Sequence, residues 1–187
     1  MSNTNIFDEN ATSSLSRGSL SLGPGCLAST WTEHLRNGTS VLIRPIRGGD
    51  SELERRFIEQ LSPQSRRFRF LGEMKSPSPE LLERLTHPDS VRDVALIALI
   101  ADGAQKREIG VARFSTRPDG LACECAVAVS DEWQGQGLAT LLMSHLIDIA
   151  RARGIECMYS IDANDNSAMS ELASHLGFRR VRDPNDA

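Results

Sequence analysis

The most informative run in this sequence is Trp133-Gln134-Gly135-Gln136-Gly137-Leu138-Ala139-Thr140. It follows an alternating, strand-like segment at residues 123–129 and leads into an amphipathic helical pattern that begins at Leu138. The first N–H groups of a helix lack backbone partners and the helix dipole is positive there, so this position favours an anion. Glycine also lets a phosphate approach the backbone closely. The run predicts a phosphate site, although a plain helix start would have a similar pattern.

The glycine spacing separates this run from two common phosphate motifs. It lacks the three small residues of G-x-G-x-x-G and the Gly-Lys-Ser/Thr of a P-loop. It resembles the Q/R-x-x-G-x-G/A motif by which GNAT N-acetyltransferases bind the pyrophosphate of acetyl-CoA. The resemblance implies that acetyl-CoA is the co-substrate, held by the backbone of Gln134, Gly135, Gln136, Gly137, Leu138, Ala139 and Thr140. Many relatives have Arg where this chain has Gln134, so we expect somewhat weaker coenzyme A binding.

Composition favours one soluble domain. The chain has 187 residues, 40% of them hydrophobic and 25% charged, with a formal net charge of -4. No basic field argues for nucleic acid, and the cluster at residues 66–69 is expected to be a solvated face. No apolar run is long enough for a membrane span, and the N-terminus lacks the pattern of a signal peptide. We expect no membrane partner and a cytoplasmic location.

Four cysteines, Cys26, Cys123, Cys125 and Cys157, are scattered without a C-x-x-C pair. No companion Cys/His pair has zinc spacing, so we expect no metal and interpret the cysteines as small core residues. His145 lies on the apolar face of its predicted helix and is interpreted as a core residue.

The order of predicted elements indicates an α+β fold. Residues 1 to about 28 are rich in Ser, Asn and Gly and predict a disordered or loosely attached arm, and residues 31–35 predict a docked segment or short helix. Asp50 is a predicted cap of a helix that Ser62-Pro63 ends. A strongly apolar run at 93–101 and two further strand-like runs at 109–116 and 121–130, separated by turn signals, predict an antiparallel meander. Further strands are expected at 41–46, 155–161 and 178–181, and further helices at 78–85, from Leu138 to Gly154, and from Asn166 to Gly177.

This order matches the GNAT fold, a mixed and mostly antiparallel sheet with helices on both faces. We divide the chain into a flexible N-terminal arm, residues 1–38, and a GNAT domain, residues 39–187. Within the family, residues 41–46, 85–87 and 123–127 look most like the GNAT domain of bacterial Pat-type protein lysine acetyltransferases. Those enzymes often carry a regulatory domain that is not found in this sequence.

Glu124 is the candidate general base. On a strand it shares a face with Ala126 and Ala128, where small neighbours leave room for a substrate. An alkylammonium has a pKa of about 10.4, so a base must remove its proton near neutral pH. The pattern alone is equally compatible with a solvent-exposed Glu. Pat-type enzymes place their general base at this position, and the resemblance favours the catalytic role.

The resemblance also assigns the rest of the cofactor site. The strand end from Val127 to Val129 is expected to splay from its neighbour and to pair with the pantetheine arm, and one N–H there polarises the thioester carbonyl. Asn166 caps the last helix, and in the family an Asn at this position also reaches the pantetheine.

The sequence departs from the family in two places. Many GNAT enzymes have a Tyr at the position of Ala173, where it protonates the departing thiolate. The family's final strand has no counterpart near Ala187, so the strand is absent or its slot is filled by the N-terminal arm or by a partner chain. An open sheet edge invites pairing, which predicts a homodimer or a swapped segment.

The resulting hypothesis is an acetyl-CoA-dependent N-acetyltransferase that acetylates a primary amine, with a protein lysine as the best guess. Two alternatives stay open: a small-molecule amine acetyltransferase and a non-catalytic acyl-CoA-binding sensor. The sequence does not identify the amine or distinguish acetyl from longer acyl donors.

Overall fold

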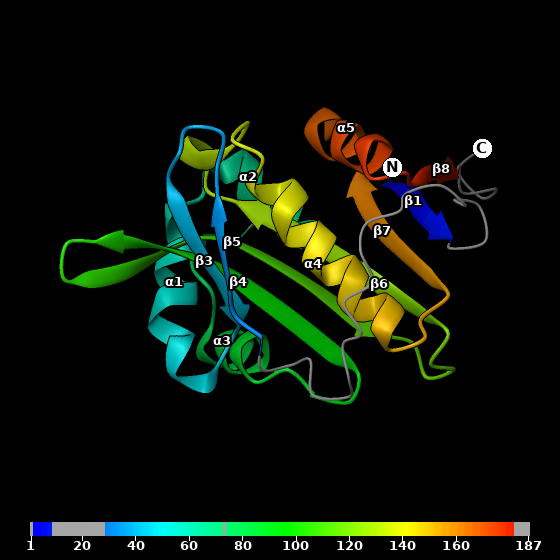
Figure 1. Ribbon diagram of the computed structural model, residues 1–187, viewed down its shortest axis with the longest axis horizontal. Coiled ribbons are helices and arrows are strands. Elements are labelled where there is room, and N and C mark those ends of the chain that lie inside the picture. Colours follow the sequence, from blue (N-terminus) through cyan, green and yellow to red (C-terminus); the bar gives the residue numbers. More distant parts are fainter. Residues whose placement is uncertain (1, 9–28, 73, 182–187) are drawn as a thin grey trace.

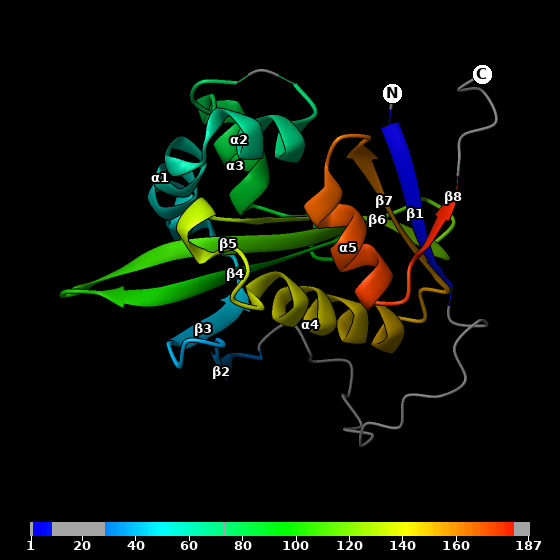
Figure 2. The ribbon, with the colours of Figure 1, turned by 90° about the horizontal axis from the view of Figure 1, so that it is seen from above.

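The computed structural model describes residues 2–8, 29–72 and 74–181, which form one eight-stranded mixed sheet covered by helices on both faces (Figures 1 and 2). The strands lie in the order β2-β3-β4-β5-β6-β7-β1-β8. Their bounds are β1 (Ser2–Asp8), β2 (Trp31–His34), β3 (Ser40–Pro45), β4 (Asp93–Asp102), β5 (Gln105–Thr116), β6 (Ala122–Val129), β7 (Cys157–Ala163) and β8 (Arg179–Val181). The helices are α1 (Ser51–Gln60), α2 (Pro63–Phe70), α3 (Pro79–Thr86), α4 (Leu138–Ala152) and α5 (Ser167–His175), with 3-10 turns η3 (Gly48–Asp50) and η4 (Asp131–Trp133). The predicted fold class is confirmed.

The centre of the sheet is the predicted antiparallel meander of β4, β5 and β6. A bulge shifts the register of β4 and β5 between Ala98 and Leu99. Among the strands that the structure describes, only β6 and β7 pair in parallel, as expected for strands joined through a helix. The strand-like runs and the turn signals between them therefore predicted these strands to within a few residues.

Two apolar clusters hold the layers together. One lies between the sheet and α4 and α5, with Leu142, Met143 and Leu146 fully buried. The other lies between the sheet and α1 to α3, around Phe57 and Ile58. Figure 2 shows α1 to α3 above the sheet and α4 below it. Each face of the sheet is thus closed by its own core.

The N-terminal segment differs from the predicted loose arm. Residues 2–8 form β1, which lies between β7 and β8 and pairs with both in antiparallel register. Phe7 is buried, with its ring centroid 5.3 Å from that of Phe178. Asn5 Nδ2 donates to Asp162 Oδ2 at 2.9 Å. The N-terminal arm therefore takes the strand position that the sequence left open, and residues 9–28, including Cys26, lie outside the described residues.

The segment predicted as a docked run or short helix is also a strand. β2 pairs with β3 at the edge of the sheet, and its Trp31 ring stacks on His145 with centroids 4.4 Å apart. His145 Nε2 lies 2.8 Å from Glu33 Oε1, so His145 is a packed and partnered residue, as predicted. Alternation of half-buried and exposed side chains along β2 explains why a strand is preferred over a helix there.

One helix prediction is confirmed and another needs correction. α1 ends at Gln60, just before Ser62-Pro63, as predicted. Ser62 also begins a second helix that the sequence analysis missed, because its hydroxyl caps α2 by accepting from Ser65 N at 3.2 Å. The Asp50 side chain does not cap α1. Its carboxylate instead pairs with the Arg44 guanidinium at 2.7 Å and accepts from Arg47 N at 2.8 Å. The Asp50 carboxylate binds the Arg44 guanidinium rather than the free N–H groups of α1, because hydrogen bonds between two charged groups are stronger.

Among the described residues, no helix has the length and apolar character to span a bilayer, and no three His, Cys, Asp or Glu side chains gather as metal ligands do. Cys123 and Cys125 are buried in the core below the sheet, as predicted.

Candidate active site

The parallel strands β6 and β7 separate part of the way along their length. They pair only at Ala122–Cys157, Cys123–Met158 and Glu124–Tyr159. On its other side β7 pairs with β1 along its whole length, while β6 continues to Val129 along β5. The edge of β6 that carries Val127 and Val129 is therefore left without a β7 partner, as the sequence predicted. Figure 1 shows the two strands diverging beside α4.

Glu124 lies where this divergence begins. Its side chain is exposed, and its cross-strand neighbours are Ser115 on β5 and Tyr159 on β7. Ala126 and Ala128 follow on the same face, which is the face covered by α1 to α3. The predicted alternation of β6 is thus confirmed, and it leaves small side chains between Glu124 and the end of the strand.

Tyr159 is the register partner of Glu124 on β7 and carries a phenol hydroxyl. Burial raises the pKa of Tyr159, and the negative charge of Glu124 raises it further. The phenol therefore keeps its proton at neutral pH. Ala173 is buried in the core. Of the two positions, only Tyr159 offers a hydroxyl.

The glycine run forms a tight loop before α4. Gly135 and Gly137 adopt φ angles of 72° and 87°, in the left-handed region that favours glycine. The first N–H to reach a carbonyl of the helix is that of Leu141, which donates to Gly137 O at 3.1 Å. The N–H groups of Leu138, Ala139 and Thr140 precede it and have no carbonyl within the helix to bind. This is the geometry of an anion site at a helix N-terminus.

The side chain of Gln134 does not point at this site. Its Nε2 donates to Val129 O at 3.3 Å and lies 3.4 Å from Ser65 Oγ. Gln134 therefore ties the loop to the end of β6 and to α2 through its side chain.

Asp131 also fastens α2 to the loop, and the sequence analysis missed it. Its carboxylate accepts from Ser62 N at 2.9 Å, Ser62 Oγ at 2.8 Å and Ser65 Oγ at 2.7 Å. Partial burial acts to raise the pKa of Asp131, but these hydrogen bonds lower it below its usual value. The carboxylate thus stays charged and holds the N-terminus of α2 against η4.

The opposite side of the divergence is marked by Asn166 and Asp165. Asn166 Oδ1 caps α5 by accepting from Met169 N at 3.1 Å, which is its predicted structural role. Asp165 forms an ion pair with Arg67 of α2. Since Asp131 holds the other end of α2, this helix bridges the ends of β6 and β7. These contacts join residues that are between 66 and 98 positions apart in the sequence, so no local sequence pattern predicts them.

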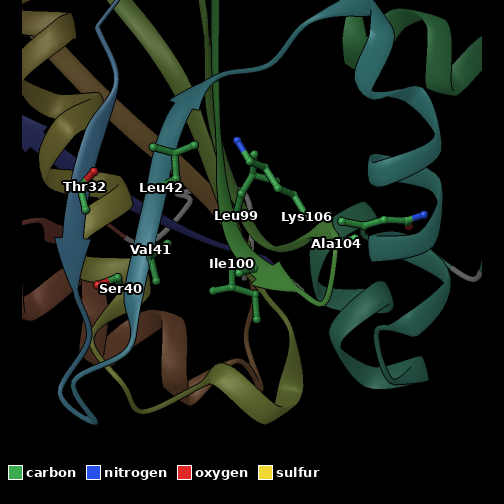
Figure 3. Close-up of a pocket in the computed structure, with 10 residues that line it drawn as sticks. Thr32, Ser40, Val41, Leu42, Leu99, Ile100, Ala104 and Lys106 are labelled. Atoms are coloured by element: carbon green, nitrogen blue, oxygen red, sulfur yellow. The ribbon is translucent and has the colours of Figure 1, made fainter.

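A separate pocket of about 270 Å³ lies between β3 and the β4–β5 hairpin (Figure 3). Its lining is mostly apolar and includes Val41, Leu42, Leu99 and Ile100. None of the site residues predicted from the sequence lines this pocket, so it is distinct from the region around Glu124.

Comparison with known proteins identifies the family. Residues 59–178 match the model of the acetyltransferase (GNAT) family. An acetyltransferase of Pseudomonas aeruginosa, PA5475, is 47% identical over 157 residues, which are 84% of each chain. The chain therefore belongs to the GNAT family and is an acetyltransferase, and the co-substrate that this family uses is acetyl-CoA.

Pat-type proteins are more distant relatives. Acetyltransferase Pat of Mycolicibacterium smegmatis is 29% identical over 80% of this chain, which spans only 44% of that protein. The solved GNAT domain of PAT from S. lividans is 29% identical, with a TM-score of 0.77 over 88% of this chain and 95% of that domain. The predicted likeness to Pat-type GNAT domains is confirmed.

Proposed function

We propose that this protein transfers an acetyl group from acetyl-CoA to the ε-amine of a protein lysine, with Glu124 as the general base. The observation that carries the proposal is the position of Glu124, an exposed carboxylate at the point where β6 and β7 diverge. The lysine acceptor rests on the Pat-type relatives alone.

The residues of the site have distinct roles in this proposal. The loop from Gln134 to Thr140 binds the pyrophosphate through its backbone, and Asn166 borders the pantetheine arm. The free edge at Val127 and Val129 pairs with that arm and polarises the thioester carbonyl. Glu124 accepts the proton of the incoming ammonium, directly or through a water, so that the neutral amine attacks.

Departure of the thiolate needs less help. A thiol has a pKa of about 8.5, so its anion is a tolerable leaving group near neutral pH. The absence of a Tyr at Ala173 is therefore compatible with turnover. Tyr159, beside Glu124 and protonated at neutral pH, is the hydroxyl best placed to return the proton.

Replacement of Glu124 by Gln tests the base directly. We expect E124Q to lower kcat by roughly 10²–10⁴-fold, the usual contribution of a general base, and to leave the Kd of acetyl-CoA unchanged. The matched control is Glu171→Gln, which removes the same charge from an exposed position on α5. Equal kcat values for E124Q and wild type would rule out Glu124 as the general base. A wild type that binds acetyl-CoA but acetylates no amine would support the non-catalytic sensor alternative.

A panel of acceptors decides the substrate class. Lysine peptides and denatured lysate proteins represent protein acceptors, and polyamines and free amino acids represent small amines. Faster acetylation of the protein acceptors at equal amine concentration supports the lysine proposal, and the reverse supports the small-molecule alternative. Parallel assays with longer acyl-CoA donors compare acyl groups.

A homodimer and a cytoplasmic location remain predictions. Since β1 covers the edge of β7, the reason to expect a dimer now applies only to the edge at β8. Light scattering at high protein concentration tests it.

A further inference from the structure

The turn between β2 and β3 lies directly against the glycine loop, although 99 residues separate the two in sequence. Arg36 N donates to Gln136 O at 3.1 Å, which fixes the backbone of the turn. Arg36 Nη1 lies 3.4 Å from Gly135 O, and its Nε would lie 3.7 Å from a Cβ added at Gly137. Figures 1 and 2 both show this turn beside the start of α4. The guanidinium therefore rests on the two left-handed glycines of the loop.

The positive charge of Arg36 is not used within the described part of the chain. No ion pair found among the described residues includes Arg36, and its side chain is exposed. The acidic residues nearest the loop are already engaged, since Asp131 binds Ser62 and Ser65, and Glu132 pairs with Arg107 at 2.5 Å. A single contact of 3.4 Å to a carbonyl leaves most of the five donors of the guanidinium available.

The loop itself carries no cation that faces the anion site. Gln134 is neutral, and its amide is held by Val129 O and Ser65 Oγ. The backbone N–H groups of the loop supply only partial charges. A diphosphate bound at Gly135 and Gly137 would therefore have the full positive charge of Arg36 close by.

We propose that Arg36 binds the diphosphate of coenzyme A and supplies the charge that Gln134 does not. The proposal rests on the use of acyl-CoA by this site. The planar guanidinium presents paired donors that match two phosphate oxygens, which a lysine does less well. Because the N–H of Arg36 holds the turn in place, replacement of its side chain leaves that backbone contact intact.

Isothermal titration with coenzyme A and with dephospho-coenzyme A, which lacks the 3′-phosphate, tests the assignment. We expect R36A to raise the Kd of both ligands by the same factor, roughly tenfold, as for loss of a charge-assisted hydrogen bond. R36K should recover part of the loss. The matched control, Arg117→Ala, removes a charge at the β5–β6 turn, at the opposite end of β6 from the loop, and should leave both Kd values unchanged.

Each other outcome overturns the proposal in a distinct way. A loss seen with coenzyme A but not with dephospho-coenzyme A would assign Arg36 to the 3′-phosphate. Equal binding by R36A and wild type would remove Arg36 from the site and leave the proposed function standing. A folded wild type that binds neither ligand would overturn both the role of Arg36 and the use of acyl-CoA.

Discussion

Truncation of Phe7 to Ala tests whether the N-terminal segment is a structural strand. Only 7% of Phe7 is exposed, its ring packs beside Phe178, and the Arg151 guanidinium lies 5.3 Å from its ring centroid. Deleting a buried phenylalanine side chain typically costs about 3–5 kcal/mol. Because Phe7 lies near the outer edge of the sheet, we expect the lower limit, about 3 kcal/mol.

This loss is a large part of the stability of a domain, which is typically about 5–15 kcal/mol. For a chain of this size, 1 kcal/mol corresponds to a Tm change of roughly 2–4 °C, so F7A should lower Tm by about 6–12 °C. Thermal and urea unfolding measure the effect. The matched control is Val181→Ala in β8, at a side chain that is 43% exposed, where we expect a change within about 0.5 kcal/mol.

An F7A variant that melts within 1 °C of wild type would refute the assignment of residues 2–8 to the sheet. A further measurement distinguishes a strand of the same chain from one exchanged between two chains. If β1 belongs to its own chain, the Tm of wild type should not depend on protein concentration. If chains exchange β1, Tm should rise with concentration, because association stabilises the folded state.

Two further predictions concern buried titratable groups. Burial, and then the negative charge of Glu54, raise the pKa of Glu108 well above the value of about 4.3 expected in the unfolded chain. The native state therefore binds the proton more tightly, and wild-type stability should fall as pH rises through the interval between the two pKa values. Urea unfolding from pH 4 to 8 should show this fall in wild type but not in E108Q, and parallel curves would contradict it. Burial, and then Cys157, raise the pKa of Cys123 to about 12, so at pH 8 Ellman's reagent should label Cys123 only as fast as the protein unfolds.

The parts of the fold that could be predicted have local signals. The meander combines a continuous apolar run at β4 with the alternation of β6. Helix α4 keeps a helical period until Gly154, which adopts a φ of 75° just past its end. Glu124 was placed on the correct face for the same reason, since alternation along β6 fixes which side chains share a side.

The parts that could not be predicted depend on distant partners. Residues 2–8 contain few apolar side chains, and their role is set by β7, about 155 residues further along the chain. Ser62-Pro63 follows the end of α1 and also begins α2, and the sequence analysis recognised only the first of these two roles. Asp131 and Arg67 bind partners that are far away in the sequence, Ser65 and Asp165. The spacing of residues along the chain does not predict such contacts.

Position 134 shows how such distant contacts change the interpretation of a motif. Taken alone, Gln134 in place of Arg predicts weaker coenzyme A binding, because a charge contact is lost. In the folded protein the Gln134 amide joins the end of β6 to α2, and Arg36 from another part of the chain lies on the loop. If Arg36 binds the diphosphate as proposed, the site regains the charge that the motif lacks, and the affinity for coenzyme A should depend on the β2–β3 turn. The affinity for coenzyme A would then depend on two segments that lie 99 residues apart, and the motif by itself would not predict it.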